Sequence, residues 1–83
     1  MNIYEKTLMN PNSKPDSNFI NEATENLIEE IGYIEWKYNV NLTKYRLDIN
    51  NITEKWKSMN LSDIAYYLSS FYNDICKEYE LRE

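Results

Sequence analysis

The chain has 83 residues and a formal net charge of −5, with one glycine, two prolines, one cysteine and no histidine. A chain of this length folds as one domain with a modest core, and so few turn residues argue against a β-protein. The missing histidine removes the commonest general base and zinc ligand, and Cys76 alone cannot form an internal disulfide or a thiolate cluster. We therefore expect a non-enzymatic protein that uses no metal and no cofactor.

The remaining composition bears on location and on partners. The N-terminal sequence lacks a basic start followed by an apolar run, and no segment approaches 18 apolar residues. We therefore expect no signal peptide and no membrane span, in a cytoplasmic protein. The negative net charge opposes direct binding to nucleic acid and to a membrane surface. The chain is rich in Asn, Lys, Ile and Tyr, which A/T-rich codons encode. This composition is typical of a low-GC bacterium or of its phage. If a phage encodes the protein, we expect it in the cytoplasm of the host cell.

Residues 1–18 are predicted to form a short helix or arm and a loop. Asn2 followed by Glu5 is typical of a helix N-terminus, because the two residues can satisfy each other's backbone donors. The stretch NPNSKPDSN, residues 10–18, contains both prolines and five Asn or Ser residues, which indicates a loop. We expect this loop to cross the outside of the domain.

A long helix is predicted over residues 19–38, with Ser17 or Asn18 as its N-cap. Apolar residues recur on one side of it at steps of three and four. These residues are Ile20, Ala23, Leu27, Ile31, Ile34 and Tyr38. Asn39 and Asn41 are poor helix formers and predict a turn. If that turn stayed helical, residues 19–59 would instead form one helix of about 60 Å and an elongated homodimer.

Two more helices are predicted, from Leu42 to Met59 and from Leu61 to Tyr79, with the same apolar spacing. Asn60 with Asp63 suits the N-terminus of the last helix, although Ser62 competes as the cap. The middle helix is basic and the other two are acidic, which favours packing them together. The fold class expected is all-α: a single domain over residues 1–83, with a small antiparallel three-helix bundle over residues 19–83.

Catalytic and metal-binding patterns are weak. Glu29 and Glu30 point about 100° apart on a helix and are not expected to share a substrate. Glu22, Glu25 and Glu29 do share a face, but nothing in the sequence indicates a pocket beside them. The stretch DINNIT begins like a calcium-binding loop and lacks its glycine and its final glutamate, so we reject that site.

Aromatic residues are the unusual feature, with eight Tyr, two Trp and two Phe. Most fall on the apolar sides of the helices, but some point outward, together with a row of carboxylates. The candidate partner-binding residues are Trp36, Tyr33, Glu29, Glu25, Glu22 and Tyr66. The alternative is that the N-terminal arm folds back and covers Trp36 with Ile3, Tyr4 or Leu8. Gly32 beside them would let another segment approach closely, at about 1 kcal/mol of helix propensity.

The sequence thus favours a module that binds a larger protein. Its size, charge and composition are similar to those of small phage-encoded anti-defence inhibitors such as anti-CRISPRs, although no motif identifies a family. The partner expected is a larger protein, such as a nucleic-acid-binding protein or complex whose basic cleft would be occupied. Two alternatives stay open: a helical immunity protein or antitoxin that neutralises a toxin nuclease, and a structural homodimer or assembly component.

Overall fold

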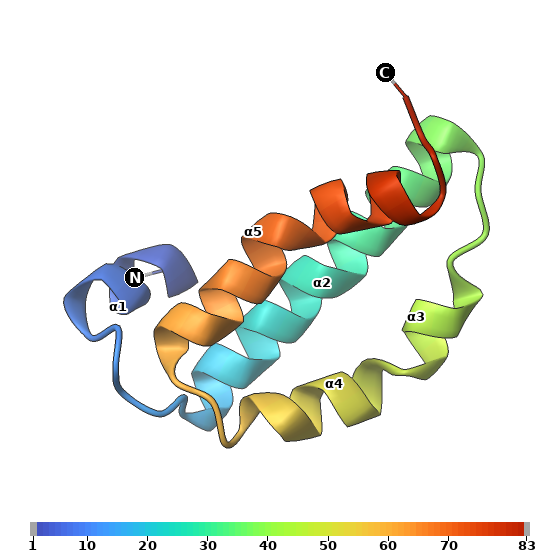
Figure 1. Cartoon of the computed structure of the whole chain (residues 1–83). Coiled ribbons are helices and arrows are strands. Elements are labelled where there is room, and N and C mark those ends of the chain that lie inside the picture. The colour runs from blue at the N-terminus through green and yellow to red at the C-terminus, as the bar shows by residue number, and fades with distance from the viewer. Residues whose placement is uncertain (1, 83) are drawn as a thin grey trace.

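The computed structural model describes residues 2–82, which contain five helices. They are α1 (Ile3–Met9), α2 (Ser17–Tyr38), α3 (Thr43–Leu47), α4 (Ile49–Trp56) and α5 (Leu61–Glu78). These residues contain no strand, so the predicted all-α fold is confirmed. The helices α2 and α5 lie side by side and run in the same direction, and the chain between them returns through α3 and α4 (Figure 1).

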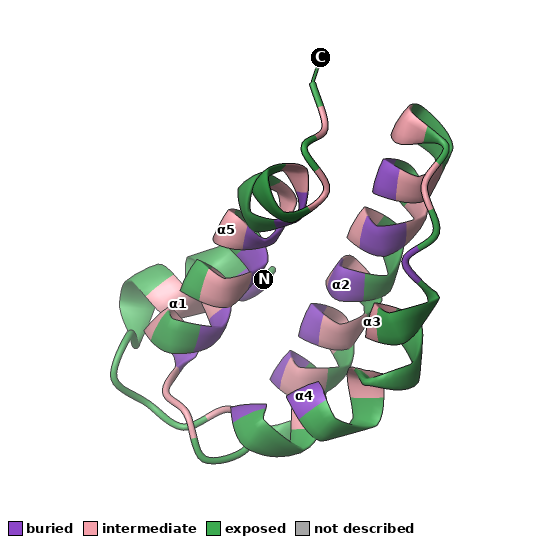
Figure 2. Ribbon diagram, turned by 45° about the vertical axis from the view of Figure 1, so that its right-hand side comes forward, coloured by how far each residue is buried: buried purple, intermediate pink, exposed green. Residues whose placement is uncertain are grey.

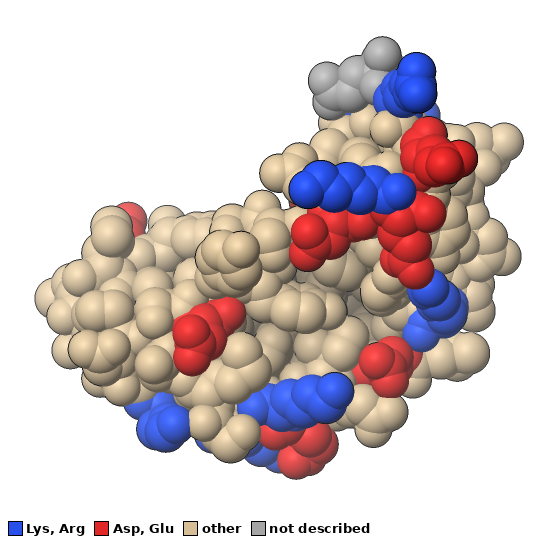
Figure 3. Space-filling view, viewed as in Figure 1, with Lys and Arg blue, Asp and Glu red and all other residues tan. Residues whose placement is uncertain are grey.

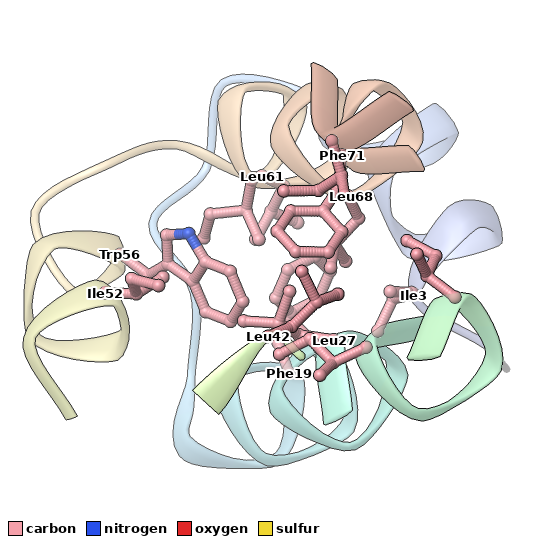
Figure 4. Close-up of a cluster of buried hydrophobic side chains, with 14 residues drawn as sticks. Ile3, Phe19, Leu27, Leu42, Ile52, Trp56, Leu61, Leu68 and Phe71 are labelled. Atoms are coloured by element: carbon pink, nitrogen blue, oxygen red, sulfur yellow. The ribbon is translucent and has the colours of Figure 1, made fainter. Parts of the chain in front are cut away.

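The core lies between α2 and α5. Their buried sides face each other and their outer sides meet solvent (Figure 2). The largest buried side chain is that of Trp56 from α4, which points into the cluster of buried side chains (Figure 4). Its ring packs edge-on against Tyr67, with 5.8 Å between ring centroids. α2 and α5 supply most of the other members: Phe19, Ala23, Leu27, Ile31, Ile34, Leu61, Ile64, Leu68, Phe71 and Ile75.

The start of α2 differs from the prediction. Asp16 is the N-cap, because its side chain accepts a hydrogen bond from the backbone N–H of Phe19 at 2.8 Å. The choice of Ser17 or Asn18 was wrong, since Asp, Ser and Asn are all good N-caps and residue type does not separate neighbours. Phe19 is fully buried, whereas Ile20 is only half-buried at the edge of the core.

The end of α2 agrees with the prediction, and one continuous helix over residues 19–59 is excluded. Asn39 adopts the left-handed conformation with φ of 54°, which Asn tolerates better than most residues. The carboxylate of Glu35 then holds the turn, since it accepts a hydrogen bond from the Leu42 N–H at 2.9 Å and pairs with Arg46. The hydrogen bond from Arg46, followed by that from Leu42, lowers the pKa of Glu35.

The predicted helix over residues 42–59 is wrong at its centre, because Asp48 divides it into α3 and α4. The Asp48 N–H bonds to the Tyr45 carbonyl at 3.1 Å, and the Asp48 side chain accepts from the Asn51 amide at 2.8 Å. Side chains of Asp and Asn compete with the helix for local hydrogen bonds, and three of residues 48–51 are of these types. The bend lets Leu42 at one end and Trp56 at the other both reach the core.

The basic middle segment is paired with its acidic neighbours, as predicted. Lys44 on α3 contacts Glu78 on α5 at 2.6 Å, and Arg46 contacts Glu35 on α2. Exposed pairs of this kind each stabilise a fold by well under 1 kcal/mol, so they orient α3 more than they hold it.

The N-terminal segment packs against the start of α5 (Figure 1). Asn2 caps α1 through the Glu5 N–H at 2.9 Å, as predicted, and Ile3 is fully buried. The following loop bonds to the first turn of α5: the Leu61 N–H donates to the Ser13 carbonyl at 2.9 Å, and the Ser62 N–H donates to the Pro11 carbonyl at 3.0 Å. The loop thus satisfies donors that every helix start leaves unpaired.

We predict that Ile3→Ala lowers the free energy of unfolding by about 2 kcal/mol or more, because it removes a fully buried side chain. Leu8→Ala on the same helix is the matched control, since Leu8 is 83% exposed and its truncation should change stability by less than about 0.5 kcal/mol. Urea denaturation followed by circular dichroism measures both. Equal effects would contradict the docking of α1.

Candidate functional site

The outer side of α2 carries an exposed aromatic pair. Trp36 is 79% exposed and Tyr33 is 46% exposed, with 6.2 Å between their ring centroids. The predicted outward direction of both residues is confirmed. The N-terminal segment leaves Trp36 uncovered, because Ile3 is buried where α1 packs against α5 and α2.

Tyr33 also connects Trp36 to Tyr38 at the end of α2 and to Tyr72 in the C-terminal half of α5. The Tyr72 centroid lies 6.3 Å from that of Tyr33 and 6.2 Å from that of Tyr38, and the hydroxyls of Tyr38 and Tyr72 share a hydrogen bond. The Nζ of Lys37 lies 5.3 to 5.8 Å from the centroids of all three tyrosine rings and donates to the Tyr72 hydroxyl at 3.1 Å. We call Tyr33, Trp36, Tyr38 and Tyr72 the aromatic patch.

Three carboxylates extend the same side of α2 toward its N-terminus. Glu25 and Glu29 are exposed and Glu22 is half-buried. The ion pairs within residues 2–82 engage Glu35, Glu54 and Glu78, and none of them engages these three. The row from Glu22 to Trp36 spans about 21 Å at 1.5 Å per residue. We call Glu22, Glu25 and Glu29 the acidic row.

A hollow of about 400 Å³ lies where α1, α2 and α5 meet. Its lining residues are Tyr4, Asn26, Leu27, Glu29, Glu30, Tyr33, Leu68 and Phe71. The expectation that no pocket borders the α2 carboxylates is therefore wrong, and Glu29 and Glu30 line the same space despite their different directions. Partial burial raises the pKa of the Glu30 carboxyl.

Tyr66 is exposed, as predicted, but the structure places it in a second depression rather than beside Trp36. This groove, of about 410 Å³, runs between α1 and α5 and is lined by Tyr66, Tyr4, Leu8 and Ala65 among others. The surface over α1 and the start of α5 is mainly uncharged, whereas charges gather around α3, α4 and the end of α5 (Figure 3). Tyr4 lines both the groove and the hollow, so it connects Tyr66 to Tyr33.

Sequence reasoning missed Tyr4, Tyr72 and Glu30 as members of this surface. Tyr72 is half-buried against the edge of the core, with its ring turned toward Tyr33 and Tyr38. Tyr4 was expected only as a cover for Trp36. No periodic signal within one helix indicates which residues of another helix will lie beside it.

Other kinds of site find no support in the described residues. Within residues 2–82, no three His, Cys, Asp or Glu side chains are placed to hold a metal ion. No helix in this range has both the length and the apolar character needed to cross a membrane. Comparisons of the chain with protein-family models, with curated proteins and with solved structures found no match. The proposal for function therefore depends on the chemistry of the aromatic patch, the acidic row and the hollow.

Gly32 does not serve a close approach, contrary to the prediction. It faces α3, and a Cβ placed on it would lie 3.8 Å from the nearest side-chain atom outside its own helix, Nη2 of Arg46, which is ordinary van der Waals contact. Its backbone does not have a positive φ. An alanine therefore fits at this position without strain.

We predict that Gly32→Ala raises the free energy of unfolding by about 0.5–1 kcal/mol, because glycine loses more backbone freedom in a helix. Thermal and urea unfolding measure the change. Ala23→Gly, at a fully buried position of the same helix, is the opposite control and should destabilise by at least as much. A destabilised Gly32→Ala would mean that a neighbour packs closer to α2 than the structure has it.

The two tryptophans provide an optical test of the site, since Trp36 is exposed and Trp56 is 1% exposed. We predict that a Trp56→Phe variant, which retains Trp36, emits at long wavelength and is quenched efficiently by acrylamide. A Trp36→Phe variant, which retains Trp56, should emit at shorter wavelength and resist quenching several-fold better. Equally weak quenching of the two variants would place Trp36 under a cover.

Proposed function

We propose that this protein is a non-enzymatic, protein-binding module that acts by stoichiometric binding, with Trp36 as the anchor of its contact surface. The observation that carries this proposal is the exposure of Trp36, in contact with Tyr33 at the end of the acidic row. Tyr and Trp dominate binding energy at protein interfaces because they bring large apolar area with little entropic loss.

The charges favour a basic partner surface. Three cations of the middle segment, Lys44, Arg46 and Lys57, are paired within the chain, while the acidic row has no such partners in residues 2–82. Complementary charge speeds association and selects the partner. The same distribution opposes direct contact with phosphate.

A protein that binds nucleic acid presents a surface of the required sign. The role that we propose is therefore inhibition of a nucleic-acid-binding host protein, of the kind that phage-encoded anti-defence proteins such as anti-CRISPRs perform. The acidic row lies on one side of one helix and is about 21 Å long with Trp36 included. This shape suits a specific docking face better than a broad imitation of the phosphate backbone.

The test is an affinity capture from host-cell lysate with two matched baits, wild type and Trp36→Ala, followed by mass spectrometry. We predict that wild type retains a basic protein that the variant loses, with affinity lowered by about 30-fold or more, as for an interface hot spot of 2 kcal/mol. Raising the ionic strength should also weaken wild-type binding.

Leu47→Ala is the matched control, because Leu47 is 80% exposed on α3, outside the patch and the acidic row. It should bind like wild type, and circular dichroism should report unchanged helicity for both variants. The proposal fails if wild type captures no specific protein, or if Trp36→Ala binds as tightly as wild type.

A further inference from the structure

The hollow has the composition of a site for one side chain. Leu27, Leu68 and Phe71, all buried, supply apolar surface. Tyr4 from α1 and Tyr33 from α2, each about half exposed, add two aromatic rings. A volume of about 400 Å³ lies toward the small end of ligand pockets, which run from about 300 to 1,000 Å³. Such a space suits a single long side chain.

The charged side chains of residues 2–82 that line the hollow are all negative. Glu29 and Glu30 line it, and neither Lys nor Arg does. No ion pair within residues 2–82 engages either carboxylate. Partial burial raises the pKa of Glu30, which means that its charged form lacks the solvation that water or a cation would supply. A cationic group in the hollow would supply it.

We propose that the hollow binds an arginine side chain presented by the partner protein, with the guanidinium paired to Glu30 and lying against the tyrosine rings, and the methylene groups on the apolar surface. This inference rests on the proposed function and names the chemistry of its partner. Arginine fits better than lysine, because its planar group bonds carboxylates in a bidentate manner, stacks on aromatic rings and is less strongly hydrated.

Lys37 shows that one ring of the hollow, that of Tyr33, already accommodates a cation. Its Nζ lies 5.8 Å from the Tyr33 centroid, within the range of a cation–π contact. Lys37 also contacts Tyr38 and Tyr72, so it lies over the aromatic patch. It is not among the residues that line the hollow. Among residues 2–82, no Lys or Arg lines the hollow, which leaves it open to a cation from a partner.

The test needs no partner protein. The full ¹⁵N-labelled chain is titrated with N-acetyl-arginine methylamide, with the uncharged isostere N-acetyl-citrulline methylamide and with N-acetyl-lysine methylamide. We predict saturable amide shifts for Tyr4 and for residues 26–33 with the arginine compound at millimolar concentrations. The citrulline compound should bind about fivefold more weakly or not at all, because it cannot pair with Glu30.

Two variants test whether Glu30 binds the arginine compound. Glu30→Gln should weaken arginine binding about fivefold, while Glu25→Gln, on the acidic row outside the hollow, should leave it unchanged. Thermal melts confirm that both variants are folded. Equal binding of arginine and citrulline, shifts confined to other residues, or equal binding of lysine would each overturn the proposal.

The outcome can be separated from that of the proposed function. If arginine fails to bind the hollow while Trp36→Ala still loses the partner, the docking face stands and the arginine site falls. If arginine binds as predicted while no partner depends on Trp36, the site stands as a cation pocket and the proposed docking face falls.

Discussion

The buried contact between α2 and α5 is the constraint on which the rest of the structure depends. The two helices run in the same direction, so residues 39–60 must lead the chain from the end of α2 back to the level of its start (Figure 1). Helices as short as α3 and α4 are not stable alone in water. They persist because the bend at Asp48 lets Leu42 and Trp56 both enter the core.

The surface owes its shape to α1. Burial of Ile3 and the backbone bonds from the loop to the start of α5 fix where this short helix lies. Only then does Tyr4 border both the hollow on one side and the groove on the other. Tyr4 is the residue of α1 that lines the hollow beside Glu29 and Glu30, so the N-terminal segment is part of the candidate site.

Features that depend on one helix could be predicted from the sequence. The direction of Trp36 and Tyr33 follows from about 100° per residue, and the cap at Asn60 follows from local hydrogen bonding. The bend at Asp48 was missed because apolar spacing takes no account of polar side chains that compete for the backbone. The hollow was missed because it forms only where three segments distant in sequence meet, and no local period encodes that meeting.

Some glutamates form ion pairs within the chain, and others have carboxylates that could pair with a partner protein. Glu35, Glu54 and Glu78 are committed to cations of the chain, whereas the acidic row and Glu30 all come from α2 and have no such partner in residues 2–82. Like charges three and four residues apart destabilise a helix by a few tenths of a kcal/mol each. Repulsion among the carboxylates of the acidic row therefore destabilises α2 slightly, on the side that also presents Trp36. If the net charge of −5 were spread evenly over the surface, it would not orient an approaching partner. Because the carboxylates without a partner in residues 2–82 lie along α2, a cationic surface is attracted to that side of the molecule.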